Sequence, residues 1–394
     1  MMTREAVLTV ALTTDLLSTW TAADVARIGG LDGHAIPLVT RAAIAPVIPG
    51  LDLWDLWPVQ LVDGRTADFD GWSLWMILSA PVLPDPDLRH HQARIRLVAS
   101  RDGCWKDCGD LLPDGLNIGS REWAGTALFD PDSATLTLFY TASGYRGEPT
   151  PSFAQRLCQT RAHLSVTDGL AVTTGWTPLV ESVVADGVHY VVVDQKEGVP
   201  GFIKGFRDPA HFRDPETGED YLFFTGSLKP ACSDWNGVIG VAHSTSGQHD
   251  RWTLLPPILS ADGVNNELER PVMIWRDGLY YLFWSTQRKV FEPSGPQGPN
   301  GLYGMVGTSP LGPFRPLNGH GLVAANPDDA PYQTYSWWVT QDLTVHGFVD
   351  LVDVASAQDV VDDAAWRRAH FGGVPAPVFK IRLEGDRAFV DTNG

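Results

Sequence analysis

Short runs rich in Val, Ile, Tyr, Phe and Trp follow one another along this chain, and turn sequences rather than helices separate them. Asp214-Pro215-Glu216-Thr217-Gly218 and Ser309-Pro310-Leu311-Gly312-Pro313 are two of these turns. Many short antiparallel strands without helices between them require a sandwich, a barrel or a propeller. The sequence therefore predicts an all-β fold.

The expected strands are the runs with the strongest enrichment in β-branched and aromatic residues. They are residues 72–79, 95–100, 135–141, 189–193, 221–225, 238–243, 280–285, 303–308 and 348–352. Helical signals are sparse. We expect one capped helix within residues 18–28, with Thr21 as N-cap and Asp24 three positions on, and a second short helix near residues 360–368.

A turn followed by an aromatic strand ending in Ser or Thr recurs along the chain, and this recurrence favours a propeller. The repeat is too weak to count blades. No linker stands out, so we expect residues 1–394 to form a single domain with a short N-terminal helical extension. Inner strands of a propeller point at one central channel, where residues distant in sequence meet.

Composition excludes several classes of partner. The 394 residues are 44% hydrophobic, enough for a large core, and the net charge of -18 argues against nucleic acid and anionic membranes. No stretch approaches the roughly 20 apolar residues that span a bilayer. The apolar run at residues 6–12 has no strong basic region before it, so we expect no signal peptide; the compartment stays open between cytoplasm and non-standard secretion. Cys104 and Cys108 are either a disulfide pair or free thiols.

Three distant segments place a carboxylate in an aromatic, otherwise uncharged neighbourhood. Asp55 lies between Trp54 and Trp57, and Asp208 follows Phe206 and Arg207. Carboxylates rarely sit among large apolar side chains without a partner or a task. The alternative for Asp55 is an exposed turn, which its aromatic neighbours disfavour.

The third segment is Glu267-Leu268-Glu269-Arg270-Pro271, in which Glu267 and Glu269 share one face of an extended chain. Two like charges close together raise one pKa, which suits a proton donor. The alternative is a solvated sheet edge. A second Arg-Asp-Pro, at residues 213–215, leads into a polar turn, so we expect Asp214 to be a turn residue.

Cleavage of a glycosidic bond needs such carboxylates, one to attack or stabilise and one to donate a proton. Other chemistries lack their motifs, since the sequence contains no Gly-x-Ser-x-Gly, Walker loop, His-Glu-x-x-His or dinucleotide fingerprint. The adjacent pair His90-His91 lies in a loop-like sequence, and we expect it at the surface.

In these segments the chain resembles glycoside hydrolase family 68, the levansucrases, inulosucrases and bacterial β-fructofuranosidases. The likeness runs in order through nearly the whole chain. Its segments are residues 18–24, Trp54-Asp55-Leu56-Trp57-Pro58, Glu122-Trp123-Ala124-Gly125, Phe206-Arg207-Asp208-Pro209, residues 264–271, residues 317–323 and residues 331–336. The resemblance implies a five-bladed β-propeller with a central acidic pocket.

It also implies roles for the carboxylates. Asp55 would be the nucleophile, Asp208 the transition-state stabiliser and Glu269 the general acid/base, since Glu269 directly precedes Arg270-Pro271. Retention of configuration then requires the Asp55 and Glu269 carboxyl groups to lie about 5–5.5 Å apart.

The remaining expected substrate-binding residues surround this triad. Arg207 and Arg270 would bind sugar hydroxyls and tune the carboxylates. Trp54 and Trp123 would flank the fructosyl ring. Glu267, Gln287 and Tyr335 complete the set.

The chain departs from the family pattern near the substrate. Ala124 replaces a serine that supports the nucleophile, Gln287 replaces His or Arg, and Trp337-Trp338 replaces His-Tyr, which we expect to reshape the acceptor subsite. Asn266 sits where calcium-binding relatives have Asp, so we expect no structural calcium. We also expect no other metal and no cofactor.

We therefore expect a retaining enzyme that cleaves sucrose or a related β-fructofuranoside and passes fructose to water or a sugar acceptor. The departures favour a β-fructofuranosidase or a short-oligosaccharide transferase over a levan polymerase. Two alternatives stay open: a catalytically weakened sugar-binding propeller, given Ala124 and Gln287, and another propeller glycosidase such as one for arabinosides.

Overall fold

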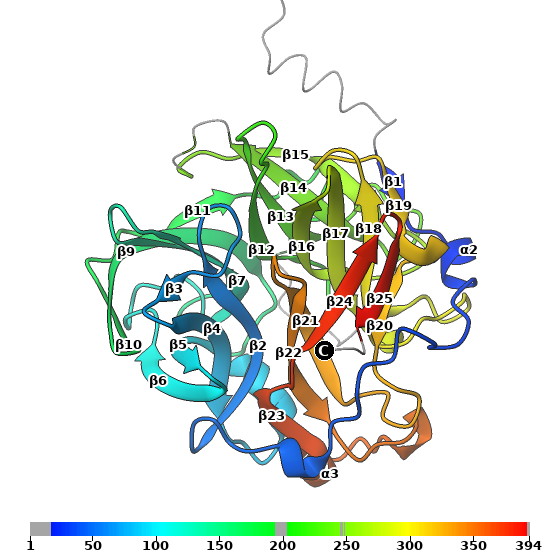
Figure 1. The fold of residues 1–394 in the computed structure, drawn as a ribbon, viewed down its shortest axis with the longest axis horizontal. Coiled ribbons are helices and arrows are strands. Elements are labelled where there is room, and N and C mark those ends of the chain that lie inside the picture. Colours follow the sequence, from blue (N-terminus) through cyan, green and yellow to red (C-terminus); the bar gives the residue numbers. More distant parts are fainter. Residues whose placement is uncertain (1–16, 194–202, 245–246, 248, 392–394) are drawn as a thin grey trace, which may run out of the picture.

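The computed structural model describes residues 17–193, 203–244, 247 and 249–391 (Figure 1). The apolar run at residues 6–12 lies outside them. Strands dominate, which confirms the all-β prediction, and they form four hydrogen-bonded sheets. Among the described residues, no helix is long and apolar enough to cross a membrane.

The largest sheet consists of two groups of strands joined by the parallel pairing of one strand from each. The first group is β2 (Leu51–Gln60), β3 (Asp68–Phe69), β4 (Trp72–Pro81), β5 (Arg94–Arg101) and β6 (Cys104–Asp110). The second group is β7 (Arg121–Asp130), β8 (Thr135–Ser143), β9 (Gln155–Thr167), β10 (Leu170–Thr174) and β11 (Val180–Val183). Strands β2 and β7 make the joint.

The other three sheets are antiparallel apart from one short parallel edge strand, β1. One contains β12 (Phe206–Arg213), β13 (Asp220–Ser227), β14 (Gly237–Ser244), β15 (Thr253–Ser260) and β1 (Ser18–Thr19). The next contains β16 (Glu269–Arg276), β17 (Leu279–Thr286), β18 (Gly301–Gly307), β19 (Phe314–Pro316) and β20 (Leu322–Ala325). The last contains β21 (Thr334–Val339), β22 (Thr344–Leu351), β23 (Phe371–Pro375), β24 (Phe379–Glu384) and β25 (Arg387–Asp391).

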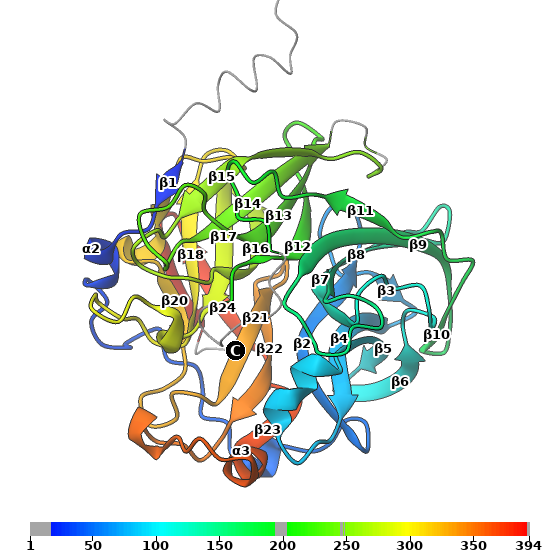
Figure 2. The same cartoon turned by 180° about the vertical axis from the view of Figure 1, so that it is seen from behind.

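Each of the two groups in the largest sheet, and each of the other three sheets, has one strand that lies toward the middle of the molecule (Figures 1 and 2). These inner strands are β2, β7, β12, β16 and β21. These inner strands pack in a closed cycle: β2 beside β7, β7 beside β12, β12 beside β16, β16 beside β21, and β21 beside β2 again. The cycle brings segments that are far apart in sequence to one axis.

Each inner strand carries a β-bulge at a corresponding place. The registers shift between Trp54 and Leu56, Trp123 and Gly125, Arg207 and Ala210, Glu269 and Val272, and Tyr335 and Trp338. Bulges bend a strand and re-aim its side chains. The bulges thus lie in the same segments that the sequence singled out.

Four of these bulges contain a non-glycine residue with positive φ: Asp55 (25°), Asp208 (59°), Arg270 (53°) and Ser336 (61°). Such conformations cost of order 1–3 kcal/mol and cluster at functional sites. The remaining bulge contains Gly125, where an added Cβ would lie 1.9 Å from the Phe139 carbonyl oxygen. Only glycine fits there.

The helices are short and peripheral. The capped helix is confirmed as α2 (Ala22–Val25), with Thr21 and Asp24 forming a reciprocal capping box, although it is shorter than expected. The second is α3 (Ala364–His370), displaced toward the C-terminus from the expected range. The described residues also contain short 3-10 helices: η1 (Arg41–Ala43), η2 (Pro86–His91), η3 (Arg288–Val290), η4 (Leu317–Gly319) and η5 (Ala357–Asp359).

Trp20 anchors the N-terminal segment to the sheet of β16–β20. Its side chain is fully buried, and its ring centroid lies 5.4 Å from that of Trp284, 5.6 Å from Phe291 and 5.0 Å from Tyr303. Its indole N–H donates to the His320 carbonyl oxygen at 3.0 Å. The segment before the first inner strand therefore belongs to the core.

The structure contradicts one expectation about local structure and decides between two alternatives for the cysteines. The strand at residues 189–193 is wrong: Asp186 accepts backbone hydrogen bonds from Val188 and His189, which turns the chain, and only Tyr190 makes an isolated bridge. All four cysteines are free. Cys104 and Cys108 both lie on β6, where four residues span about 13 Å, too far for a disulfide.

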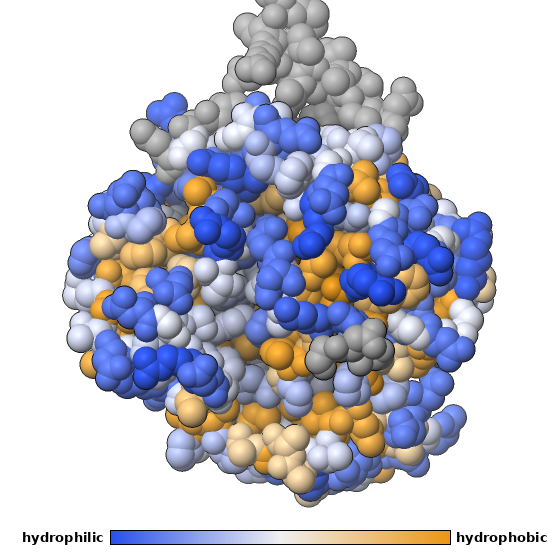
Figure 3. Space-filling model, in the orientation of Figure 1, coloured by the Kyte–Doolittle hydropathy of each residue, from blue (hydrophilic) through white to orange (hydrophobic). Residues whose placement is uncertain are grey.

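The other expected strands are present, and Asp214 lies in a turn as expected. It is buried there, accepting from the Thr217 hydroxyl at 2.7 Å and the Tyr280 hydroxyl at 2.7 Å. The face in Figure 3 is mostly hydrophilic, with apolar patches between the polar side chains.

Candidate active site

Three inner strands bring the predicted carboxylates together. Asp55 comes from β2, Asp208 from β12 and Glu269 from the start of β16. Arg207 contacts two of them, with its Nε 3.6 Å from Asp208 Oδ2 and its Nη2 2.8 Å from Glu269 Oε1. Asp55 and Asp208 lie close enough for each to feel the charge of Glu269. The three side chains form a single acidic cluster.

Asp55 lies at the bulge of β2 and is half-buried. Burial raises its pKa, while the Arg270 guanidinium and a hydrogen bond from the Ser336 hydroxyl oppose that shift. The sequence suggested that Asp55 loses a hydroxyl partner because residue 124 is alanine. Ser336, from the bulge of β21, supplies one.

Asp208 has a raised pKa of about 7. Burial is the main cause, opposed by the Arg207 guanidinium and reinforced by the charges of Glu269 and Asp55. Its backbone N–H donates to the Thr141 hydroxyl oxygen at 2.9 Å, and its Oδ2 lies 3.2 Å from the Thr225 hydroxyl. Asp208 is thus fixed through both main chain and side chain.

Glu267 and Glu269 both face Arg207, whose Nη2 lies 3.4 Å from Glu267 Oε2 and 2.8 Å from Glu269 Oε1. The second oxygen of Glu269 accepts a hydrogen bond from the Tyr335 hydroxyl. Burial, followed by the charge of Glu269, raises the pKa of Glu267 to about 7, and Arg207 opposes the shift. The guanidinium Nη1 of Arg207 is buried without a protein partner, so one strong donor is left for a ligand.

Arg270 is already engaged by the protein. Its Nη1 donates to the Ser336 carbonyl and hydroxyl oxygens at 2.8 and 2.7 Å, and its Nη2 donates to the Leu56 carbonyl oxygen at 2.6 Å. The guanidinium lies over the rings of Trp57 and Trp338. Arg270 therefore ties β16 to β21 and β2, and it acts on Asp55 through its charge.

The predicted aromatic residues surround this cluster. Trp54 is fully buried on β2, Trp123 is half-buried on β7, and neither indole N–H has a protein partner. Gln287 is half-buried and lies just before η3. Trp337 and Trp338 are buried with 1% and 2% exposure, as Trp54 is with 1%, and their effect on the acceptor subsite stays a prediction.

Hydroxyl residues on neighbouring strands hold the bulges, and the sequence did not single them out. Thr141 accepts from the backbone N–H of Asp208 at 2.9 Å, Thr225 from that of Arg270 at 3.1 Å, and Ser285 from that of Trp337 at 2.9 Å. Each hydroxyl belongs to the second strand of one group and holds the first strand of the next. The recurrent Ser or Thr at strand ends was the signal that could have found them.

The sequence also did not single out Arg89 and His90, the residues that form a rim beside Trp54. The Arg89 guanidinium lies 5.5 Å from the Trp54 ring centroid, and the His90 ring lies edge-on at 5.7 Å. The surface prediction holds for His91 but is wrong for His90, because η2 turns that side chain against Trp54. Burial lowers the pKa of His90 well below its ordinary value.

Asp350, at the end of β22, adds a further carboxylate to the rim. Burial raises its pKa to about 6, while the charges of Arg89 and Lys289 oppose the shift. No local pattern marks this residue in the sequence, because only the packing of β22 beside β2 brings it near the cluster.

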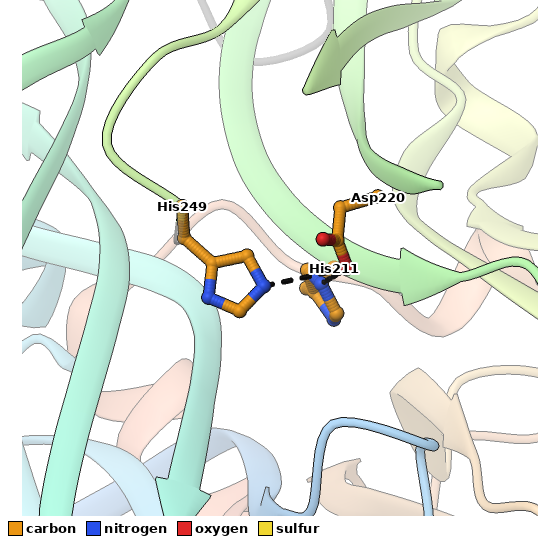
Figure 4. Close-up of side chains that lie close together, drawn as sticks. All are labelled: His211, Asp220 and His249. Atoms are coloured by element: carbon orange, nitrogen blue, oxygen red, sulfur yellow. Dashed lines mark hydrogen bonds and ion pairs between the residues drawn. The ribbon is translucent and has the colours of Figure 1, made fainter. Parts of the chain in front are cut away.

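One group of His and carboxylate side chains in the described part of the chain has the spacing of a metal site (Figure 4). Asp220 Oδ1 lies 2.8 Å from His211 Nε2 and 3.3 Å from His249 Nε2. However, Arg213 donates to both Asp220 oxygens, at 2.9 and 2.7 Å, and balances the carboxylate charge. A divalent ion would add an uncompensated charge there, so this group fits a buried hydrogen-bonded cluster better than a metal site.

The sequence matches the family model described as Levansucrase/Invertase over residues 10–234 and 231–393. Together these matches cover nearly the whole chain, including every segment of the acidic cluster. The chain belongs to glycoside hydrolase family 68.

Individual relatives of this family 68 protein agree. It is 30% identical to a levansucrase of Rahnella aquatilis, over 94% of both chains, and 31% identical to a levansucrase of Zymomonas mobilis, over 95% of this chain and 90% of that one. Among solved structures, it is similar to an inulosucrase from Halalkalicoccus jeotgali bound to kestose, with a TM-score of 0.86 and 36% identity over 95% of each chain. The resemblance inferred from the motifs is confirmed.

Proposed function

We propose that this family 68 member is a retaining, fructosyl-transferring glycosidase that cleaves sucrose or a related β-fructofuranoside. The observation that carries the proposal is the meeting of Asp55, Asp208 and Glu269 at the bulges of three inner strands, with Arg207 between two of them. The levansucrases and the kestose-bound inulosucrase among its relatives support a fructoside as substrate.

Glu269 serves as the general acid in the first half-reaction. Its proton passes to the glycosidic oxygen as the bond to the fructosyl anomeric carbon breaks, and the bonding electron pair leaves with that oxygen. Arg207 and Tyr335 hold the two oxygens of Glu269 and so set the direction of transfer. Glu267 contacts the same Arg207 guanidinium and places a second carboxyl group beside Glu269.

Asp55 serves as the nucleophile and Asp208 as the stabiliser. The Asp55 carboxylate bonds to the anomeric carbon through an oxocarbenium-like transition state, giving a fructosyl-enzyme. Asp208 hydrogen-bonds fructosyl hydroxyls more strongly as positive charge develops there. Water or a sugar hydroxyl then attacks the anomeric carbon, Glu269 takes its proton, and Asp55 is released.

The surrounding residues bind the sugar. Trp54 and Trp123 offer aromatic faces and free indole N–H groups, and Arg207 offers its unpaired Nη1. For Gln287, half-buried just before η3, we propose contact with the leaving group, and for Tyr335 the hydrogen bond to Glu269. For Arg270 we propose electrostatic tuning of Asp55 rather than sugar binding, because both its Nη groups are taken by the protein.

The same proposal includes the architecture, a five-bladed propeller forming one catalytic domain with a short N-terminal extension. Its support is the closed cycle of inner strands β2, β7, β12, β16 and β21, each followed by its own antiparallel partners. The largest sheet divides into two such groups at its parallel β2–β7 joint. The high structural similarity to the inulosucrase agrees with this.

The test is incubation with sucrose and separate measurement of free glucose and free fructose. Equal release indicates hydrolysis, and glucose in excess indicates transfer. Asp55→Ala should reduce both by at least about 10⁴-fold, as expected for loss of a nucleophile, with an unchanged melting profile. Fructoside binding without turnover by the unaltered protein would contradict the proposal.

A further inference from the structure

Lys204 places its ammonium group at the junction of three loops beside the acidic cluster. The residue lies just before β12, and its Nζ donates to the Asp234 carbonyl oxygen, to Asn236 Oδ1 at 2.8 Å and to Asn266 Oδ1 at 3.1 Å. The first two acceptors belong to the β13–β14 connection, and Asn266 belongs to the segment before β16. One side chain thus joins three separate parts of the chain.

The fit between donor and acceptors is complete. An ammonium group has three N–H donors and no acceptor, and Lys204 has an oxygen partner for each of them. All three partners are neutral oxygens, while the carboxylates of Asp234, Glu267 and Asp262 lie near enough to favour the charged form of Lys204 against its burial. The position is therefore built for a cation.

A divalent metal ion does not fit the same position. Calcium binds through several oxygen ligands, and charged carboxylates set its affinity. Here no carboxylate oxygen is among the three ligands, Asn266 provides an amide, and an ammonium already occupies the middle.

The junction is coupled to the acidic cluster through Asn266. Its Nδ2 lies 3.4 Å from Glu267 Oε1 and donates to the Ile203 carbonyl oxygen at 3.3 Å. Glu267 in turn faces Arg207 at 3.4 Å, and Arg207 holds Glu269 at 2.8 Å. A shift of Asn266 would therefore reach the proposed general acid through Glu267 and Arg207.

We propose that Lys204 is a built-in cation that replaces a bound metal ion and positions the Glu267–Glu269 segment for catalysis. Lys204 is a positioning residue, since it acts through Asn266 and Glu267 and touches no reacting group. The catalytic part of this inference rests on the proposed function, and the cation part does not.

The test compares Lys204→Met with Lys106→Met. Lys106 is the matched control because its Nζ donates to a single carbonyl oxygen, that of Asp168, on the edge strand β6. Lys204→Met should lower the melting temperature and reduce kcat/KM on sucrose about 10- to 100-fold, the loss typical of groups that orient an active-site ligand. Its pH profile should also move to higher pH, because removal of a nearby positive charge favours protonated carboxylates. Lys106→Met should leave all three unchanged.

A second pair of variants tests the cation itself by thermal melting in CaCl2 and in EDTA. The unaltered protein and Asn266→Asp should melt equally in both, because Lys204 fills the position. Lys204→Ala combined with Asn266→Asp should melt higher in CaCl2, since it gains both room and a carboxylate ligand.

Two results would overturn the proposal: a Lys204→Met profile identical to that of Lys106→Met, or calcium-dependent melting of Asn266→Asp while Lys204 is present. Should Lys204→Met fail to fold, the Asn266→Asp melts still decide. The melting results do not depend on turnover, so failure of this inference is distinguishable from failure of the proposed function.

Discussion

At the scale of single residues, the carboxylates of the acidic cluster differ in which arginine lies beside them. Arg207 contacts Asp208, Glu267 and Glu269, whereas Asp55 has Arg270. Neighbouring carboxylates with different environments take different protonation states, which is the condition for separate acid and nucleophile roles.

Tyr335→Phe tests the contact that holds the proposed general acid. Hydrogen bonds to charged groups are worth about 1.5–3 kcal/mol, so loss of the hydroxyl on Glu269 should lower kcat/KM on sucrose about 10- to 100-fold. Tyr332→Phe is the control, since Tyr332 is half-buried in the same segment. Equal kinetics for the two variants would contradict the role of Tyr335.

The raised pKa of Asp208 predicts a pH-dependent stability. Its folded pKa of about 7 exceeds the ordinary value of 3.8, so its favourable contribution is present at low pH and is lost as pH rises through about 7. Asp208→Asn should therefore raise the melting temperature by about 2 °C or more at about pH 8 and leave it unchanged at about pH 4. An equal shift at both pH values, or a shift matched by Asp63→Asn at the exposed Asp63, would argue against this cause.

At the scale of elements, the bulges matter more than the strands that contain them. A regular strand would point alternate side chains into the two faces of its sheet, whereas a bulge redirects one residue toward the axis. Thr141, Thr225 and Ser285 stabilise these bulges by accepting the backbone N–H groups that the ladder leaves unpaired.

Thr225→Val tests this support. The substitution keeps the shape but leaves the Arg270 N–H unpaired, which should destabilise the fold by about 1–3 kcal/mol and lower kcat on sucrose. Thr225→Ser retains the hydroxyl and should recover both. The control is Thr174→Val, at an exposed threonine on β10. No recovery in Thr225→Ser would show that packing of the methyl group, and not the hydrogen bond, is what counts.

The sequence predicted the strands and the meeting of Asp55, Asp208 and Glu269, because aromatic context and turn chemistry are local signals. It did not predict the contacts of His90, Asp350, Thr225 or Lys204. Asp350, Thr225 and Lys204 contact parts of the chain that belong to other sheets, and a single sequence without repeats strong enough to align contains no record of which strands are neighbours. His90 contacts Trp54 of its own sheet through the turn of η2, which no local pattern marks. The false strand at residues 189–193 has the same origin, since the capping by Asp186 outweighs a β-rich composition.

At the scale of the whole molecule, the two ends of the described chain are tied to each other beside the sheet of β16–β20. The segment around Ile36 follows β20 through backbone contacts with Ala325, and the Val390 N–H on β25 donates to the Gly33 carbonyl oxygen at 2.9 Å. Trp20 fastens the same N-terminal segment to the sheet of β16–β20.

Trp20→Ala should therefore destabilise the whole fold, not only its N-terminal segment. A fully buried tryptophan replaced by alanine costs about 3–5 kcal/mol, and chemical denaturation followed by fluorescence measures the change. Trp105→Ala, at a half-buried position on edge strand β6, should cost much less. A similar loss for both variants would mean that Trp20 does not anchor the fold more strongly than a tryptophan on an edge strand.

The ring of bulges also bears on how such an enzyme can diversify. Asp55, Asp208 and Glu269 each lie at the bulge of an inner strand and not on a connection between strands. If the proposed roles hold, exchanging a connection between strands can alter which sugar is accepted while the distance between the proposed nucleophile and general acid stays the same, so new specificities are reachable without rebuilding the chemistry.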